Sequence, residues 1–377
     1  MKKLITFLAL VLVALSSYAI TPLWMRDARI SPDGSEIVFC YKGDIYKVPA
    51  QGGAAVQLTT QASYEANPVW SPDGKQIAFA SDRNGNFDLF IMSADGGTAR
   101  RLTFHSASEI PSAFTPDGKF VLFSASIQDP ANSALFPTGA MTELYKVPVS
   151  GGRTEQVLAT PAEWVCFDKA GKNFLYQDRK GFEDEWRKHH TSSITRDIWL
   201  YDTKTGKHTN LTNHAGEDRN PVLSPDGKSV YLLSERKGSF NVYSFPLDNA
   251  QDLKAVTSFK THPVRFLSMS HGGTLCYAYD GEIYTQKDNA TPQKINIDIV
   301  RDDQDKIADL TFTNGATSGT VSPDGKQIAF IVRGEVFVTS TDYATTKQIT
   351  HTPAREAGLT FAPDNRTPVS YTHLTLP

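Results

Sequence analysis

The sequence is poor in cysteine and in long apolar runs. Its 377 residues include three cysteines, Cys40, Cys166 and Cys276, whose spacings match neither a disulfide framework nor a metal pattern. Cys40 and Cys276 lie in strand-like runs, which favours small buried side chains. After residue 19 no apolar stretch approaches the ~20 residues that a membrane-spanning helix needs. We therefore expect no membrane segment in the mature chain.

Strong charge of either sign is also lacking. Lys and Arg number 38 against 41 Asp and Glu, for a net charge of −3, which gives no electrostatic reason to bind nucleic acid. The chain has no Gly-x-Ser-x-Gly elbow, no His-Glu-x-x-His helix and no phosphate-binding glycine loop. These absences predict no nucleic-acid partner, no cofactor, no metal site and no catalytic residue within this chain.

The N-terminus has the pattern of a signal peptide. Met1–Lys3 is basic, Leu4–Leu15 is almost continuously apolar, and Ser17–Ala19 is a small-x-small cleavage site. We expect residues 1–19 to be removed and the protein to be exported, to a Gram-negative-type periplasm or outside the cell. The alternative, a retained membrane anchor, is disfavoured because the apolar core is short.

A turn sequence repeats along the chain. Ser-Pro-Asp-Gly begins at Ser31, Ser71, Ser224 and Ser322, and degenerate copies begin at Thr115, Asp168, Ser270 and Ala362. Successive copies start 40 to 56 residues apart. Proline suits the second turn position, aspartate bonds its own backbone, and glycine accepts a positive φ. Each copy is therefore expected to join two strands.

The segments between the turns read as short strands without amphipathic helices. Residues 76–80 and 327–330 alternate or run apolar, as strands do, and Gly-Gly pairs precede a last strand in several units. One four-stranded unit cannot bury both its faces, but units packed radially around an axis can. The sequence thus predicts an all-β fold, a six-bladed β-propeller of four-stranded antiparallel blades, rather than a solenoid or a sandwich.

The repeat also suggests domain boundaries. We expect the propeller over residues 22–300, a charged linker over 301–312, and the first blades of a second, truncated propeller over 313–365. One eight-bladed ring is the alternative. Residues 366–377 do not continue the strand pattern, and we interpret them as an anomalous tail of a fragment, native or foreign.

Two motifs resemble functional sites but occupy turn positions. Ser270-His271-Gly272-Gly273 has the appearance of a nucleophile next to an oxyanion-type sequence, yet it stands in the repeat's turn register. Asp82–Asp88 alternates oxygen ligands like a calcium loop, but its glycine is misplaced for one. We interpret both as structural turns.

The most unusual stretch is the insertion Gly181–Arg196, between the expected second and third strands of the fourth unit. Another insertion, Ile127–Thr142, stands at the same place in the third unit. Loops of this kind are either solvated or carry binding residues, and Trp and Arg favour interfaces. We predict an interface role with little effect on stability, and the candidate binding residues are Trp186, Arg187, His189, His190 and Arg196.

The repeats resemble those of TolB and of tricorn protease. A propeller directly after the signal peptide, a second propeller after it, and the insertion Asp184–His190 leading to Thr195–Asp202 are similar to bacterial tricorn homologues. On these residues the chain is identified as a member of the tricorn protease family, over about residues 22–365. The resemblance implies a serine peptidase whose propellers gate and guide peptides, and whose catalytic domains would follow this chain.

Three functions follow from this resemblance. The first is the gating or binding propeller of an exported tricorn-type serine peptidase, with peptides or unfolded polypeptide as substrates and homo-oligomer formation as a further expectation. The second is a non-enzymatic, TolB-like periplasmic scaffold for protein–protein interaction. The third is the propeller of a prolyl-oligopeptidase-like hydrolase. Downstream coding sequence would discriminate them.

Overall fold

The computed structural model describes residues 22–127, 141–181, 184, 186–188, 192–287, 290–299, 314–352 and 354–371. The expected signal peptide and linker lie outside these residues. Every regular element described is a β-strand, and this part of the chain holds no helix with the length and apolar character of a membrane crossing. The prediction of an all-β fold built from four-stranded antiparallel sheets is confirmed.

Six antiparallel sheets follow one another between Arg26 and Ile299 and are called blades 1 to 6. Blade 1 contains β1 (Arg26–Ile30), β2 (Glu36–Tyr41), β3 (Asp44–Pro49) and β4 (Gly53–Gln57). Blade 2 contains β5 (Glu65–Trp70), β6 (Gln76–Ser81), β7 (Asp88–Ser93) and β8 (Arg100–Arg101). Blade 3 contains β9 (Ile110–Phe114), β10 (Phe120–Ala125), β11 (Glu143–Pro148) and β12 (Glu155–Leu158).

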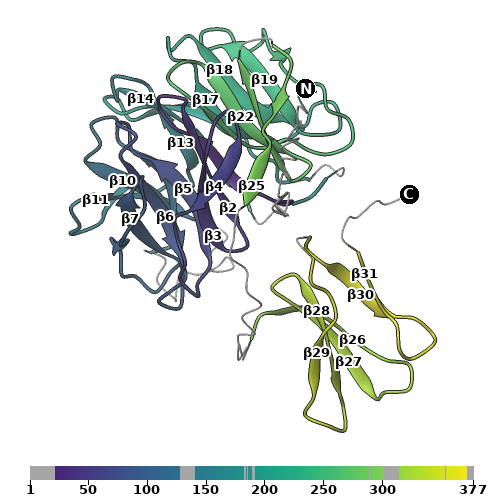
Figure 1. Ribbon diagram of the computed structural model, residues 1–377. Helices are drawn as coiled ribbons and strands as arrows, with labels where there is room; N and C mark the ends of the chain where they lie inside the picture. Colours follow the sequence, from purple (N-terminus) through teal and green to yellow (C-terminus); the bar gives the residue numbers. More distant parts are fainter. Residues whose placement is uncertain are drawn as a thin grey trace, which may run out of the picture.

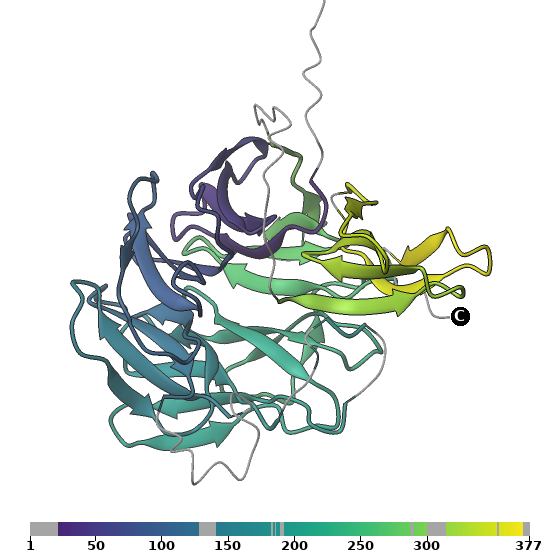
Figure 2. The same ribbon diagram turned by 90° about the horizontal axis from the view of Figure 1, so that it is seen from below.

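The other three blades repeat this order. Blade 4 contains β13 (Glu163–Phe167), β14 (Asn173–Gln177), β15 (Ile198–Asp202) and β16 (Lys207–Asn210). Blade 5 contains β17 (Asp218–Leu223), β18 (Ser229–Ser234), β19 (Asn241–Pro246) and β20 (Lys254–Ala255). Blade 6 contains β21 (Arg265–Met269), β22 (Thr274–Tyr279), β23 (Glu282–Lys287) and β24 (Gln293–Lys294). Figures 1 and 2 show the blades side by side around a common centre, from purple to green.

The turn sequence forms the same hydrogen bonds in its copies. The Ser31 hydroxyl donates to Asp33 at 2.6 Å and accepts the Glu36 N–H at 3.0 Å, while Gly34 has a φ of 79°. Hydrogen bonds from Ser31 and Ser35 lower the pKa of Asp33 to about 2. The same pair of hydroxyl bonds recurs at Ser71, Thr115, Ser224 and Ser322. This local chemistry explains why the turns were predictable.

Aromatic side chains pair across the second and third strands of most blades. Phe39 of β2 stacks on Tyr46 of β3 with ring centroids 5.7 Å apart. Stacked pairs at the same register are Phe79–Phe90, Phe123–Tyr145, Tyr176–Trp199 and Tyr277–Tyr284. Each fully buried ring of this size contributes about 2 kcal/mol of hydrophobic stabilisation. These pairs belong to the apolar layers that hold neighbouring blades together.

The last and first blades are in contact. β1 lies against β21 and β22, and one apolar cluster joins Phe39 of blade 1 to Cys276 and Ile283 of blade 6. After blade 6, β25 (Ile297–Ile299) returns to blade 1 and pairs in parallel with β4. The Gly53 N–H donates to the Asn296 carbonyl at 2.8 Å just before that pairing. The edge strand of blade 1 is thereby covered.

Two further sheets follow, coloured light green to yellow in Figure 1. The first contains β26 (Ala316–Val321), β27 (Gln327–Val332), β28 (Glu335–Ser340) and β29 (Thr346–Gln348). The second pairs β30 (Ala357–Phe361) with β31 (Pro368–Tyr371). Strand β31 corrects the expectation that the strand pattern stops at residue 365, because backbone pairing with β30 needs no apolar alternation. Residues 372–377 lie outside the described part.

Candidate functional site

The first strands of the six blades lie next to one another at the common centre. Strands β1, β5, β9, β13, β17 and β21 each contact the first strand of the next blade, and each carries a β-bulge. In five of the blades the residue four positions before the turn sequence lies at the bulge and has positive φ: Asp27, Asn67, Trp164, Asn220 and Phe266. In blade 3 that position is Pro111, which lacks a positive φ. A bulge redirects a side chain out of the ordinary alternation of a strand. The bulges therefore determine which side chains reach the central channel.

A cavity of about 480 Å³ occupies the channel beside blades 1 to 4. Its charged and aromatic lining consists of Asp27, Arg29, Glu163, Trp164 and Arg179. Burial raises the pKa of Asp27, although a hydrogen bond from the Asn67 N–H opposes that shift. Burial also lowers the pKa of Arg29 to about 10, so its guanidinium stays protonated at neutral pH. A pocket of this volume fits a small ligand or a short segment of peptide.

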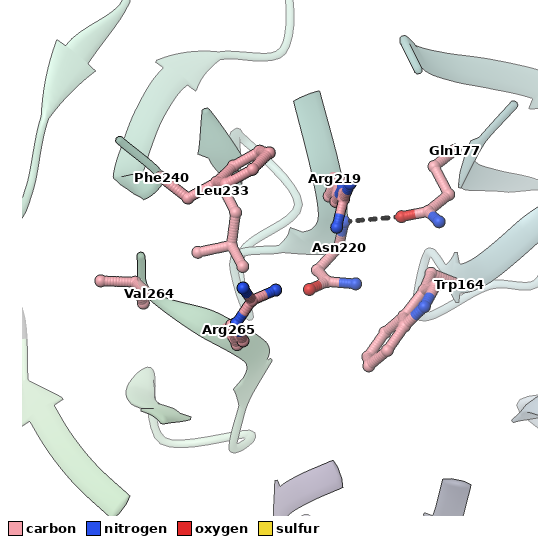
Figure 3. A pocket seen from close by; sticks show the side chains of 8 residues that line it. All are labelled: Trp164, Gln177, Arg219, Asn220, Leu233, Phe240, Val264 and Arg265. Atoms are coloured by element: carbon pink, nitrogen blue, oxygen red, sulfur yellow. Dashed lines mark hydrogen bonds between the residues drawn. The ribbon is translucent and has the colours of Figure 1, made fainter. Parts of the chain in front are cut away.

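Arg29 and Trp164 meet inside the channel. Arg29 belongs to β1 and Trp164 to β13, three blades further along, and the guanidinium carbon lies 4.1 Å from the indole centroid. Trp164 also lines a smaller cavity of about 30 Å³ beside blades 4 to 6. Figure 3 shows Arg265, Asn220 and Trp164 converging on that space, with the Asn220 N–H donating to Gln177 at 2.9 Å. Trp164 thus lines both the wide and the narrow cavity, whereas Arg29 lines only the wide one.

Part of the blade 4 insertion lies where the inner strands β1 and β21 begin, at the end of the channel that is called the mouth. Three of its described residues, Trp186, Arg187 and Lys188, are called the strap, and they lie between β14 and β15. The Trp186 ring lies 4.6 Å from the guanidinium carbon of Arg26 in blade 1 and 5.0 Å from that of Arg265 in blade 6. Arg265 also donates hydrogen bonds to the carbonyls of Trp186 and Arg187, at 2.9 and 3.1 Å. The strap therefore bridges from blade 4 to blades 6 and 1.

Buried ion pairs fix the strap to blade 5. Arg187 donates to Glu217 at 2.6 Å and to Glu235 at 2.5 Å. Glu217 also accepts from Arg196 at 2.7 Å and from Arg219. Burial alone would raise the pKa of Glu217, but the hydrogen bond from Arg219 and the surrounding arginines outweigh it and lower the pKa to about 2. Glu217 is thus ionised at neutral pH and holds three arginines.

These contacts revise the prediction for the insertion. Arg187 and Arg196 are only 4% and 2% exposed, so their charges serve the interior of this chain rather than its surface. Trp186 is partly exposed and keeps its candidate binding role, while His189 and His190 lie outside the described residues. The contacts argue against the expectation that the insertion matters little for stability, because removing Arg187 would take from Glu235 its cation and from Glu217 one of its three.

A second set of arginines holds the acidic side chains near the start of the inner strands. Arg83 donates to Glu65, Arg179 to Glu163 and Arg236 to Asp218, at 2.9 to 3.1 Å, each from the same position after its blade's second strand. In blade 3 that position is Ile127, so among the described residues the corresponding Glu109 has no such cation, and both its oxygens are buried with no hydrogen-bond partner there. Burial raises the pKa of Glu109 to about 7.

Asp197, His214 and Asp218 offer the nearest approach to a metal site among the described residues. Their ligand atoms lie within 4.8 Å of one another. Lys180 already contacts Asp197 at 2.6 Å, and Arg236 contacts Asp218 at 3.1 Å. Because these two cations neutralise both carboxylates, we interpret the group as an ion-pair network.

The two motifs interpreted as turns are turns. The Ser270 hydroxyl accepts the Thr274 N–H at 3.1 Å, and the Gly273 N–H donates to the Ser270 carbonyl at 3.0 Å, as in the other repeats. In the Asp82–Asp88 stretch, the Gly85 N–H donates to the Asp82 carbonyl at 2.9 Å, and Asp88 pairs with Arg101 at 2.8 Å. Neither stretch presents a free set of catalytic or ligating groups.

Comparison with known proteins agrees with this geometry. Residues 22–292 match the family model of the tricorn protease N-terminal β-propeller domain. The chain belongs to this family. Its structure is similar to the crystal structure of the tricorn protease, with a TM-score of 0.61 and 21% identity over 90% of this chain and 32% of that one. At this identity the likeness concerns the fold.

Curated relatives of the tricorn-type propeller are longer than the part matched. A tricorn protease homolog of Saccharolobus solfataricus is 26% identical over 52% of this chain and 18% of its own length. An uncharacterized peptidase of Bacillus subtilis is 27% identical over 60% of this chain and 31% of its own length. An uncharacterized protein of Agrobacterium fabrum is 24% identical over 50% of this chain and 61% of its own length. The chain thus spans less than two thirds of each of these relatives.

The residues that shape the channel of this tricorn-type propeller were not among the predicted site residues. Arg29, Trp164 and Asn67 carry no catalytic motif, and nothing in their local sequence is unusual. A signal does exist, because in five of the six blades the bulge residue with positive φ stands four positions before the turn sequence. Aligning the repeats on the turns would have selected Asp27, Asn67 and Trp164 as channel positions.

Proposed function

We propose that this chain is the substrate-gating propeller of an exported, tricorn-type serine peptidase that degrades peptides. One observation carries the gating role: Trp186 of blade 4 is held over the channel mouth by Arg26 and Arg265 of two other blades. Because Trp186 covers part of the mouth, a peptide would enter the channel through the part left open, next to the cavity of about 480 Å³. The catalytic groups would belong to other parts of the full-length protein.

The proposal includes the architecture around the channel. Blades 1 to 6 form one closed six-bladed ring, and β26–β31 begin a second propeller. The pairing of β25 with β4 and the apolar cluster shared by blades 6 and 1 support the closed ring over an eight-bladed one. The repeated turn at Ser322, with the same hydroxyl bonds as at Ser31, supports the second propeller.

Export to the periplasm or the extracellular space is part of the same proposal. It rests on the basic residues Lys2 and Lys3, the apolar run Leu4–Leu15 and the small residues of Ser17–Ala19. Mass spectrometry of the secreted or periplasmic protein should find an N-terminus directly after Ala19. Recovery of the uncleaved chain in the membrane fraction would contradict this part.

Gating is tested in the full-length protein with Trp186→Ala. Opening the mouth should raise the turnover of long peptides relative to short ones, because short peptides pass the unaltered opening. Phe104→Ala is the matched aromatic control, since Phe104 is 73% exposed and contacts no strap residue. An unchanged ratio of long to short peptide turnover would reject gating by the strap. A full-length protein without any peptidase activity would instead favour the scaffold function.

A further inference from the structure

Arg29 is the channel arginine whose hydrogen-bonding capacity is unused within the described part of the chain. Its Nε is buried without a partner, and no carboxylate there lies within ion-pair distance of its guanidinium. The other arginines of the channel region have acceptors: Arg179 bonds Glu163, Arg219 and Arg196 bond Glu217, and Arg265 bonds two strap carbonyls. A guanidinium offers five N–H donors, and those of Arg29 are not used in an ion pair with another described residue. They are therefore available to a ligand.

The surroundings of Arg29 orient those donors. The guanidinium carbon of Arg29 lies over the Trp164 ring, 4.1 Å from its centroid, so the indole covers one side of the group. Arg29 lines the cavity of about 480 Å³, so a ligand in that space reaches its edge. Within the same cavity the Thr142 hydroxyl is also buried without a hydrogen-bond partner. Two residues that line the cavity, Arg29 and Thr142, therefore each carry a hydrogen-bond donor that no described residue accepts.

The acidic groups of the cavity are already engaged. Glu163 accepts from Arg179 at 3.0 Å and from Gln177 at 3.2 Å. Asp27 accepts the Asn67 N–H at 3.2 Å, and its charge acts on Arg29 without a direct ion pair. Neither carboxylate occupies the donor edge of Arg29. A ligand that completes the site must bring its own planar anion.

We propose that Arg29 binds a carboxylate group of a ligand in the channel cavity, with Trp164 covering one side of its guanidinium. A carboxylate matches the guanidinium edge with two parallel hydrogen bonds. The carboxylate belongs either to the end of a peptide or to a small free acid, and both share this chemistry. The site stands on the cavity geometry and does not depend on the proposed peptidase function.

Calorimetric titration of the purified chain at pH 7 and low salt tests the proposal with three probes. N-acetyl-trialanine carries a terminal carboxylate, its C-terminal amide lacks the charge, and sodium acetate is a small free acid. We expect the acid peptide to bind and the amide to bind about tenfold or more weakly, the loss typical of a charge-assisted hydrogen bond. Competition by acetate would assign the site to small acids, and its absence would assign it to peptide ends.

Variants link the effect to Arg29. Arg29→Gln should abolish the preference for the acid peptide, and Arg29→Lys should keep part of it, because lysine retains the charge but not the planar pair. Arg153→Gln, at an exposed arginine, is the matched control and should bind as the unaltered chain does. Equal affinity for acid and amide, an unaffected Arg29→Gln variant, or no saturable binding of any probe would overturn the proposal. If a variant fails to fold, the proposal is still tested by comparing the affinities of the acid peptide and its amide for the unaltered chain.

Discussion

Arg187 of the strap and Glu235 of blade 5 form a buried ion pair with a shortest N–O distance of 2.5 Å, between residues 48 positions apart. The pair unites two features that the sequence analysis treated separately, an inserted loop and a hairpin that repeats between blades. Glu235 corresponds in the repeat to Asp82, whose carboxylate accepts the Tyr64 N–H at 2.7 Å. In blade 5 the corresponding carboxylate also holds the insertion of the preceding blade.

Replacing Arg187 should destabilise the propeller strongly. Arg187→Ala leaves Glu217 and Glu235 buried, with one cation fewer between them, and breaking a buried pair in this way costs about 3 kcal/mol or more. Urea unfolding of the purified chain measures the loss, and Arg153→Ala serves as the exposed control. A difference below about 1 kcal/mol, the range of surface ion pairs, would show that the strap is not held in solution as described.

Glu109 should make stability fall as pH rises. Burial raises the pKa of Glu109 to about 7 in the folded chain, above the ~4.3 of an unfolded glutamate. Its contribution to stability is therefore complete below about pH 4 and is lost as the pH rises through 7. Glu109→Gln keeps the side chain neutral, so its melting temperature should exceed that of the unaltered chain at pH 8 and match it near pH 4, where the glutamate is protonated in both states.

Glu65 provides the control for this pH effect. It stands at the same place in blade 2 but is bonded by Arg83 at 2.9 Å. Glu65→Gln removes the anion that Arg83 needs, and we expect it to lower the melting temperature at pH 8, the opposite of Glu109→Gln. If the melting temperatures of the two variants changed in the same way between pH 5 and pH 8, the replacement of the arginine by Ile127 in blade 3 would have no effect on stability.

The sequence predicted what local chemistry determines. Ser31, Pro32, Asp33 and Gly34 build their turn almost entirely from their own atoms, so four letters suffice to recognise it. The position of the strap depends instead on partners far away in the chain. Trp186 meets Arg26, 160 positions earlier, only because the ring brings blades 4 and 1 together. The contact between Arg29 and Trp164 could not be predicted for the same reason, because it joins residues that are far apart in the sequence.

The isolated chain should hydrolyse no peptide. Among the described residues, the serine with the most suggestive context is Ser270, which is 3% exposed and uses its hydroxyl to accept the Thr274 N–H. A hydroxyl held in a structural turn and shielded from solvent is a poor nucleophile. A panel of fluorogenic peptides with the purified chain measures this. Turnover that Ser270→Ala abolishes would restore the catalytic interpretation of this turn, and turnover that survives it would reveal another site.

The closure of the ring by β25 is tested at two neighbouring glycines. Gly52 and Gly53 both have positive φ, 94° and 111°, so alanine is strained at either position. An alanine Cβ at Gly52 would lie 2.5 Å from the Asn296 carbonyl oxygen, whereas at Gly53 it would meet no atom within 4 Å. Gly52→Ala should therefore push the residues before β25 away from blade 1 and cost about 1–3 kcal/mol more than Gly53→Ala, the usual cost of overpacking. Chemical denaturation compares the two variants directly, with strain in the left-handed region common to both. Equal stabilities would mean that the segment at Asn296 does not rest on blade 1 in solution, and the six-bladed closure would lose its main support.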